Sequence, residues 1–211
     1  MDEIVAAALR KWPNVPHCHG WLALDARGDW YMRDDRTQAA GPFPQVKGSR
    51  VDHERLRDFI GRNYACDADG AWFFQNGPQR VYVELELTPW VWRLQQMPGS
   101  DWPAVHSHTG RPAQVQSSLL DETGRLLLLT DLGLGLVHSL DMDVAAGAVE
   151  RAAMAVNAWS TQPVNAWATQ AVRAWSPQPV RAADLPGRFG YALKPALMTS
   201  IKPSSKPATG P

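Results

Sequence analysis

The chain has 211 residues, of which 45% are hydrophobic, and its 21 Lys and Arg residues balance 21 Asp and Glu residues. This size and apolar content are typical of a globular protein with a buried core. A net charge of zero argues against a protein dedicated to nucleic acid, which needs a basic face for phosphate. Two cysteines are too few for a secreted disulfide scaffold, and no segment predicts a signal peptide or membrane span, so we expect a cytoplasmic protein.

The first 50 residues carry a helix pattern and then a strand pattern. Apolar spacing over residues 2–11 predicts a short amphipathic helix, acidic at its start and basic at its end, as the helix dipole favours. From Gly20 the apolar period changes to two, and WLALD and DWYMR flank an Asp-x-x-Gly turn at residues 25–28. This pattern predicts a β-hairpin. Residues 34–49 are rich in glycine and proline and predict a long irregular loop.

A second helix is predicted over residues 52–64. Asp52 is a good N-cap, and the apolar residues from Leu56 to Tyr64 form one stripe. A second Asp-x-x-Gly turn at residues 67–70 then leads into AWFFQ, an Asn-Gly turn, and RVYVELEL, in which apolar and polar residues alternate. These segments predict a hairpin with one buried face. WVWRL predicts a further short strand.

The second half of the chain predicts a separate β unit. Residues 97–112 have the composition of a linker, and a third Asp-x-x-Gly turn at residues 121–124 joins QVQSSLL to RLLLLT before another strand, LGLVHSL. The expected fold class is α+β with two small lobes: an N-terminal α+β roll of two hairpins around one helix, and a C-terminal β-roll. The predicted boundaries are 1–96 for the N-terminal lobe, 97–145 for the C-terminal β lobe, 146–183 for an Ala/Trp/Pro octapeptide-repeat insertion, 184–194 for a return strand and 195–211 for a disordered tail.

The octapeptide repeat lies near the end of the chain. VNAWSTQP, VNAWATQA and VRAWSPQP run from Val156 to Pro179 at a period of eight. Each step of eight residues rotates a helical position by about 80°, so the tryptophans would not share a helical face. The prolines in the repeat disfavour both helix and central strand. We therefore interpret the repeat as a duplication within a loop; the alternative is a tryptophan-bearing peptide that docks on a partner protein.

Four histidines are candidate metal ligands. His17 and His19 flank Cys18, and His106 and His108 could complete a site, because imidazole and thiolate suit zinc or copper. On a strand, however, the two histidines point to one face and Cys18 to the other. The spacing matches no zinc motif. We expect surface histidines here, and neither a metal nor another cofactor.

A ligand site is a second candidate. The long loop opens with charged side chains that suit recognition of a polar ligand: Arg33, Asp34, Asp35 and Arg36. Trp30 and Trp72 each follow a turn glycine by two residues, where they could stack on a ligand. Two structural alternatives stay open, a self-paired charged turn and tryptophans of the core. Cys66 has no histidine nearby in sequence, and we interpret it as a packing residue.

Several segments resemble a known family. The segments Gly28–Trp30, Leu56–Ile60, Gly70–Phe74 and Pro78–Val83 are similar to those of an uncharacterised family of proteobacterial proteins. The same order of segments resembles, more distantly, the bacterial DUF1285-type proteins of unknown function. The likeness covers residues 15–140 and the segment ADLPGRFGY, whereas the octapeptide repeat departs from it. It implies a two-lobed α+β fold and no particular activity.

Three functions remain as hypotheses. The one that we favour is a non-enzymatic cytoplasmic binding or accessory module that uses the groove between the lobes. Its partner would be an unknown small molecule or protein, and neither nucleic acid nor a membrane. The second is a metal-assisted or hydrolytic enzyme whose side chains the fold would bring together: His17, His19, Asp34, Asp35 and Cys66. The third is a partner-docking peptide formed by the tryptophan repeat.

Overall fold

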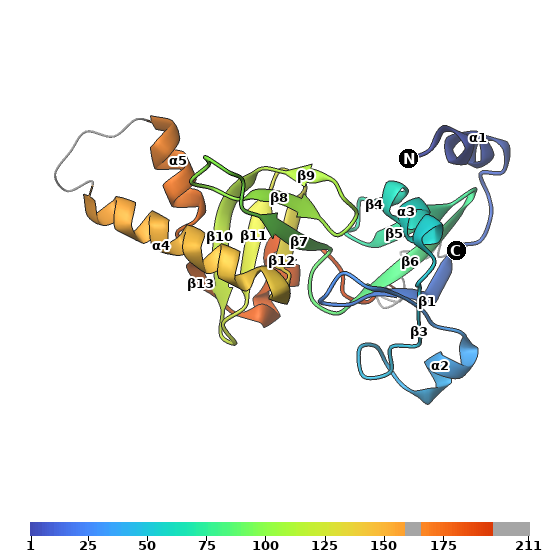
Figure 1. Cartoon of the computed structure of the whole chain (residues 1–211). Coiled ribbons are helices and arrows are strands. Elements are labelled where there is room, and N and C mark those ends of the chain that lie inside the picture. Colours follow the sequence, from blue (N-terminus) through green and yellow to red (C-terminus); the bar gives the residue numbers. More distant parts are fainter. Residues whose placement is uncertain (159–165, 196–211) are drawn as a thin grey trace, which may run out of the picture.

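The computed structural model describes residues 1–158 and 166–195 and contains two β-sheets (Figure 1). The first half of the chain forms a six-stranded sheet in the order β3-β2-β1-β6-β5-β4. We call this sheet and its helices the first lobe. Its elements are α1 (Glu3–Lys11), β1 (Cys18–Leu24), β2 (Trp30–Met32), α2 (Asp35–Ala40), β3 (Ser49–Arg50), α3 (Glu54–Arg62), β4 (Tyr64–Cys66), β5 (Trp72–Asn76) and β6 (Gln79–Leu85).

The second half forms a seven-stranded sheet in the order β13-β10-β11-β12-β7-β8-β9. We call it, with its helices, the second lobe; α4 and α5 lie beside it, on the side away from the first lobe (Figure 1). Its elements are β7 (Trp90–Gln95), β8 (Ala104–Ser107), β9 (Pro112–Ala113), β10 (Val115–Asp121), β11 (Leu126–Thr130), β12 (Gly133–Val137), η1 (Ser139–Asp141), α4 (Met142–Ala158), α5 (Ala166–Ala174), β13 (Gln178–Val180), η2 (Ala182–Asp184) and α6 (Leu185–Phe189). None of the helices in the described ranges is long and apolar enough to cross a membrane.

The buried face of the first lobe follows from the period-two pattern. Strands β1 and β6 pair in parallel, with Leu22 opposite Val83 and Leu24 opposite Leu85. These four side chains are at most 3% exposed. Ile60 of α3 belongs to the same core, so the amphipathic helix covers this face of the sheet. The prediction that Val83 and Leu85 share a buried face is confirmed, but the opposite face is not fully exposed, because Tyr82 is buried against Ala71 and Phe73.

The division between the lobes falls between β6 and β7, which differs from the predicted boundary at residue 96. Strand β7 pairs in parallel with β12 and antiparallel with β8, so it belongs to the second sheet. Trp90, Val91 and Trp92 are all at most 2% exposed. A strand buried on both faces has no alternating pattern that would assign it to a lobe. Residues 97–112, predicted as a linker, contain β8 and β9.

The start of the predicted loop at residues 34–49 is a helix. Helix α2 begins at Asp35, and Asp34 is its N-cap. The Asp34 carboxylate accepts hydrogen bonds from both the backbone N–H and the hydroxyl of Thr37. Capping of this kind satisfies the free N–H groups of the first turn and favours the helix over an irregular segment.

The N-cap of α3 is also different from the predicted one. The helix begins at Glu54, and Nδ1 of His53 accepts a hydrogen bond from the Leu56 N–H at 3.4 Å. Asp52, the predicted N-cap, instead forms an ion pair with Arg50 at 2.7 Å. The predicted position of the helix is therefore confirmed, whereas its predicted cap is wrong.

The octapeptide region is part of the second lobe. The predicted insertion at residues 146–183 contains most of α4 and all of α5 and β13. Trp175, from the third copy, is 3% exposed, and its ring stacks on Trp102 with 6.5 Å between centroids. The region therefore contains helix and strand rather than loop alone. Trp159 lies outside the described residues, as does the predicted disordered tail from residue 196 on.

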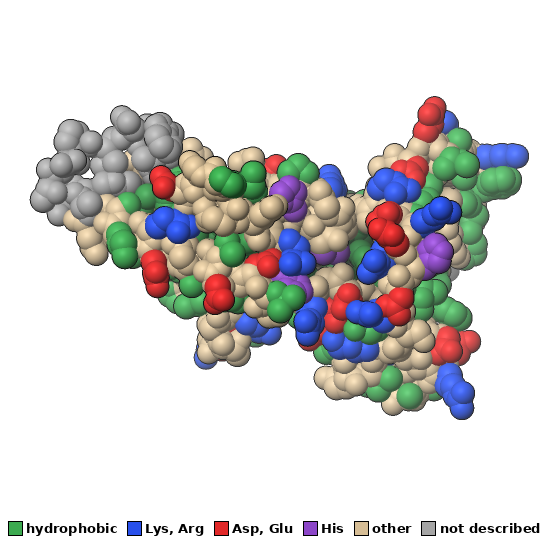
Figure 2. All heavy atoms as spheres, viewed as in Figure 1, with side chains coloured by type: hydrophobic (Ala, Val, Ile, Leu, Met, Phe, Trp, Pro, Cys, Tyr) green, Lys and Arg blue, Asp and Glu red, His purple; other side chains and the backbone are tan. Residues whose placement is uncertain are grey.

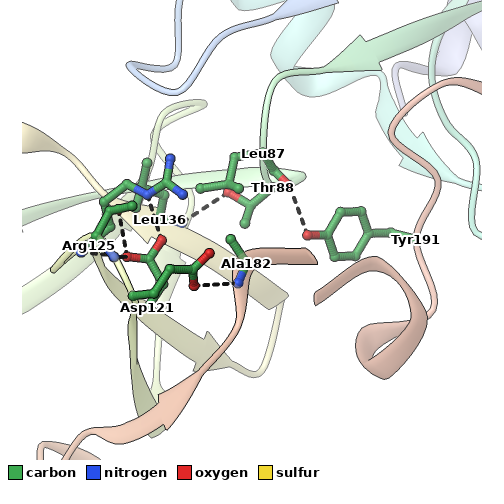
Figure 3. Close-up of polar contacts among 9 residues, drawn as sticks. Leu87, Thr88, Asp121, Arg125, Leu136, Ala182 and Tyr191 are labelled. Atoms are coloured by element: carbon green, nitrogen blue, oxygen red, sulfur yellow. Dashed lines mark hydrogen bonds and ion pairs between the residues drawn. The ribbon is translucent and has the colours of Figure 1, made fainter. Parts of the chain in front are cut away.

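The C-terminal segment returns to the first lobe, but not as the strand predicted at residues 184–194. The Ala192 N–H donates to the carbonyl of Gly70, and the Leu85 N–H donates to the carbonyl of Leu193, both at 2.9 Å. The Tyr191 hydroxyl donates to the Leu87 carbonyl at 2.8 Å (Figure 3). These bonds attach the end of the described chain to the first lobe.

Four turns share one geometry. In the turns that begin at Asp25, Asp67 and Asp121, one carboxylate oxygen accepts two backbone N–H groups at 2.9–3.0 Å, and the glycine has φ of 80–82°. The three predicted Asp-x-x-Gly turns are thus confirmed. A fourth turn occurs in the predicted linker, where the Ser107 hydroxyl accepts two N–H groups at 3.1 and 3.3 Å and Gly110 has φ of 81°. A serine hydroxyl makes the same kind of local bond as a carboxylate.

Replacing Gly70 with alanine should destabilise the protein more than replacing Gly124. Both glycines have φ near +80°, a conformation that costs an L-residue about 1–2 kcal/mol. A Cβ at Gly70 would also overlap the carbonyl oxygen of Gly190, whereas a Cβ at Gly124 meets nothing within 4 Å. In urea unfolding we expect Gly70→Ala to lower the free energy of unfolding by roughly 2 kcal/mol more than Gly124→Ala does. Equal losses would contradict the packing of this turn against the C-terminal segment.

Truncation of the Trp175 side chain should show whether the octapeptide region is packed into the second lobe or is a loop that tolerates substitution. Because its indole is 3% exposed, we expect Trp175→Ala to lower the free energy of unfolding by about 3–5 kcal/mol. Trp12, which is 51% exposed, is the matched control, and Trp12→Ala should cost less than about 1 kcal/mol. Chemical unfolding of both variants gives the comparison. A small loss of unfolding free energy in Trp175→Ala would support the interpretation of the repeat as a loop.

Candidate functional site

A cluster of rings joins the two lobes. Trp30 of β2 and Tyr64 of β4 belong to the first lobe, whereas Trp90 of β7 and His108 belong to the second. The ring centroids of Trp30–Tyr64, Tyr64–Trp90, Trp30–His108 and Trp90–His108 are 5.1–5.7 Å apart. The Tyr64 hydroxyl donates to the Pro89 carbonyl at 3.1 Å. The two contacts of Tyr64 are edge-on and the two contacts of His108 are tilted. Ring contacts have preferred orientations, so the cluster fixes how the sheets sit against each other.

Two glycines allow a close approach of the lobes beside this cluster. A Cβ at Gly28 would lie 2.8 Å from the Cβ of His108, and a Cβ at Gly61 would lie 3.0 Å from the Cβ of Thr109. Any larger residue would push the lobes apart at these points. The turn at residues 25–28 of the first lobe therefore packs directly on the turn at residues 107–110 of the second.

A polar cavity of about 910 Å³ lies at this contact, and we call it the inter-lobe groove. Both turns line it, together with Lys47, residues of α3, Arg93 of β7, and His138 after β12. Figure 2 shows Lys, Arg, Asp, Glu and His side chains gathered where the two halves of the molecule meet. The groove is thus lined by charged and hydrogen-bonding groups from both lobes.

On the first-lobe wall, Asp25 is buried and ionised. Its carboxylate forms an ion pair with Lys47 at 2.8 Å, and Lys47 also lies 3.6 Å from Glu86. Burial raises the pKa of Asp25, but hydrogen bonds from Lys47 and from the backbone N–H groups of Asp29 and Arg27 lower it further than burial raises it. The net pKa is below the usual value, so this carboxylate holds Lys47 in place at neutral pH.

On the second-lobe wall, Asp141 fixes the position of Arg93. The guanidinium donates two hydrogen bonds to the carboxylate, at 2.6 and 3.2 Å, and the Leu94 N–H donates a third at 3.0 Å. Burial raises the pKa of Asp141, but these hydrogen bonds outweigh burial and the net pKa is lowered. His106 lies opposite Arg93 in the β7–β8 pair. Arg93 is therefore a fixed cation with an imidazole beside it.

His108 is held as a neutral imidazole. Its Nδ1 accepts a hydrogen bond from the Val91 N–H at 3.3 Å, so its proton is on Nε2. Nε2 is buried and has no hydrogen-bond partner among the described residues. Burial lowers the pKa of His108 to about 3. This side chain therefore stays uncharged at the centre of the contact between the lobes.

The structure places the predicted ligand residues in different regions. Trp30 lines the groove, whereas Trp72 packs against Tyr64 and Trp90 in the ring cluster. Arg33 is buried and bonded to Glu84 at 2.6 Å. Asp34, Asp35 and Arg36 lie at the start of α2, outside the residues that line the groove.

The metal candidates are also divided. His106 and His108 line the groove, whereas the ring of His19 stacks on Tyr82 at 4.5 Å and that of His17 meets the same tyrosine edge-on. Within residues 1–158 and 166–195, no group of three His, Cys, Asp or Glu side chains could hold a metal. Loss of hydration and the neighbouring Asp67 carboxylate raise the pKa of Cys66 to about 11, which keeps the thiol protonated.

Sequence reasoning missed most of the groove. Arg27, Arg57 and Arg93 all line it, and none was a candidate. One signal was present in the sequence, because Ser107-His-Thr-Gly110 has the spacing of the Asp-x-x-Gly turns and flanks the groove. Arg27 likewise lies inside the first of those turns.

His108→Asn should change how stability depends on pH. The pKa of His108 is about 3 in the folded protein, whereas an unfolded histidine titrates near about 6.5. The unfolded chain therefore binds more protons between these values, and His108 reduces stability as the pH falls from about 6.5 toward 3. Asparagine keeps an acceptor for the Val91 N–H but does not titrate. We expect the free energy of unfolding to fall more steeply for the wild type than for the variant in this window, measured by urea unfolding; parallel curves would contradict a buried neutral imidazole.

Comparison with solved structures finds two similar folds. One is a DUF1285 family protein from Silicibacter pomeroyi DSS-3, with a TM-score of 0.43 and 11% identity over 67% of this chain and 81% of that one. The other is a DUF1285 family protein from Shewanella baltica OS155, with a TM-score of 0.40 and 14% identity over 57% of this chain and 86% of that one. No curated protein sequence matches the chain. Residues 1–196 match the model of a family described as "Protein of unknown function (DUF2946)". The chain therefore belongs to the DUF2946 family.

Proposed function

We propose that this protein is a binding module that holds a small polar molecule in the inter-lobe groove. The observation that carries the proposal is the position of the groove, where side chains of both lobes converge on about 910 Å³ of space. Clefts between structural units are common sites for small molecules, and this volume lies within their usual range. The ring cluster and the paired turns keep the two walls in a fixed relation, which favours binding without a large ordering cost.

Unpaired charges in the groove support a ligand. Arg27 and Arg57 both line it, and neither forms an ion pair with any described residue. Both side chains are exposed to solvent. They are therefore free to bind a polar molecule without first breaking an internal contact.

One reason to propose binding rather than catalysis is the low basicity of the histidine at the contact between the lobes. A histidine with a pKa of about 3, such as His108, is a poor base near neutral pH. The enzyme hypothesis needs His17, His19, Asp34, Asp35 and Cys66 in one pocket. None of these five residues lines the groove, and no hydrogen bond or ion pair among the described residues joins Cys66 to the others. A docking role for the repeat is not favoured either, because Trp175 is buried.

A matched pair of substitutions on α3 tests the proposal. Arg57 lines the groove and Arg55 does not, although both are exposed and lie on the same helix. Arg57→Trp should narrow the groove, whereas Arg55→Trp should leave it open. The probes are sugars, amino acids, organic cations, carboxylates and phosphate esters, each added to the ¹⁵N-labelled full chain at roughly 10 mM, which detects weak binding.

We expect at least one class of probe to shift the amide signals of Arg27 and Gly110, which come from opposite walls of the groove. Arg57→Trp should weaken that response by about tenfold or more, and Arg55→Trp should preserve it. If no class shifts both walls, or if the two variants respond alike, the groove is not a binding site.

A further inference from the structure

The carboxylates near Arg27 are already paired with other cations. Asp25 binds Lys47 at 2.8 Å, and Asp29 lies 3.7 Å from Arg50. Arg27, between these two aspartates in the turn, has no carboxylate partner among the described residues. The turn thus presents a cation whose own neighbours are committed elsewhere.

The opposite wall of the groove presents further donors and no free carboxylate. All of the carboxylates that line the groove come from the first lobe, and the second lobe contributes Arg93, His106, His108 and His138 as its titratable groups. Asp141, the acid behind this wall, is bonded to Arg93. The second-lobe wall is therefore suited to oxygen acceptors rather than to cations.

His138 is oriented as a donor by its own backbone contact. Its Nδ1 accepts a hydrogen bond from the Leu140 N–H at 3.1 Å, so Nε2 carries the proton. Burial lowers the pKa of His138, and the positive charges of Arg93 and Arg27 lower it further, while Asp141 and Asp29 act in the opposite sense. The charge of Arg27 thus reaches an imidazole of the other lobe across the groove. An anion placed between them would act in the opposite sense and raise the pKa of His138.

We propose that the inter-lobe groove binds the oxyanion of a small organic molecule, a carboxylate or a phosphate ester, between Arg27 of the first lobe and Arg93 and His138 of the second. This inference rests on the proposed binding function and names its ligand class. The oxyanion accepts hydrogen bonds from both walls and completes the pairing of Arg27.

Two acidic residues that line the groove disfavour a polyanion as its ligand. Glu54 and Asp58 of α3 line the groove on either side of Arg57, and neither forms an ion pair with the described residues. An extended nucleic acid strand would bring phosphates against these carboxylates. A small molecule with a single oxyanion meets less of this repulsion than a chain of phosphates.

Three probes with the same carbon skeleton test the ligand class. Glycerol is neutral, glycerate adds a carboxylate, and glycerol 3-phosphate adds a phosphate ester. Each is titrated into the full chain at constant ionic strength, with the amide signals of Arg27 and Gly110 as the readout. We expect at least one of the two anions to bind about tenfold or more tightly than glycerol, the ratio that corresponds to one added charge-assisted hydrogen bond. The anion that binds more tightly shows whether the ligand is a carboxylate or a phosphate ester.

Substitutions in each wall locate the anion. Arg27→Gln and His138→Asn should each weaken binding of the stronger anion by about tenfold. Asparagine keeps an acceptor for the Leu140 N–H, and Arg27→Lys should restore part of the binding because it keeps the charge. Arg36→Gln removes an exposed cation outside the groove and should leave the affinity for the anion unchanged. Circular dichroism establishes that each variant is folded.

The outcomes separate this inference from the proposed function. If glycerol, or a neutral or cationic probe of the panel used to test the proposed function, shifts both walls and the anions do not, the groove is a binding site but not for an oxyanion. If the anions bind and Arg27→Gln and His138→Asn bind them as tightly as the wild type, the assignment to these residues is wrong. If no probe shifts either wall, the proposed binding function itself fails.

Discussion

The close contact between the turns at residues 25–28 and 107–110 is the constraint on which the other features of the molecule depend. Each turn is internally rigid, because a side-chain oxygen of Asp25 or Ser107 accepts two backbone N–H groups. Gly28 has no Cβ, so His108 can pack against it. The imidazole then joins the ring cluster that both sheets share. The inter-lobe groove takes its walls from these two turns, so its shape follows from their contact.

The parts of this fold that local physics determines could be predicted from the sequence. The three Asp-x-x-Gly turns follow from a side chain that bonds its own backbone and a glycine with positive φ, and both properties are local. The alternation in β6 identifies its buried face, and the stripe of α3 identifies a helix. The division into two lobes also follows, because each lobe has its own run of strands. The two separate sheets agree with this division.

Features that depend on distant parts of the chain could not be predicted. Strand β7 reads as a short apolar run, and only its pairing with β12 assigns it to the second lobe. Helix α5 (Ala166–Ala174) was not predicted because the prolines of the repeat were expected to disfavour helix throughout it, but the helix itself contains no proline. The position of Trp175, directly after α5 and against Trp102, depends on a contact between distant parts of the chain. The groove depends most on distant parts of the chain, because Arg27 and His138 lie far apart in sequence and no motif spacing connects them. A search for Ser-x-x-Gly as well as Asp-x-x-Gly turns would have found the turn at residues 107–110, which forms part of one wall of the groove.

The central claim is that the two lobes form one cooperative unit, because only then is the groove a fixed site. Native-state hydrogen exchange tests this claim with one amide in each lobe. The Leu85 N–H is bonded to the Leu193 carbonyl at 2.9 Å. The Leu136 N–H is bonded to the Thr88 hydroxyl at 3.1 Å, as Figure 3 shows. Both amides should exchange only through global unfolding, with the same free energy and the same dependence on denaturant. Exchange of either amide through a separate, lower-energy opening of its own lobe would contradict the account.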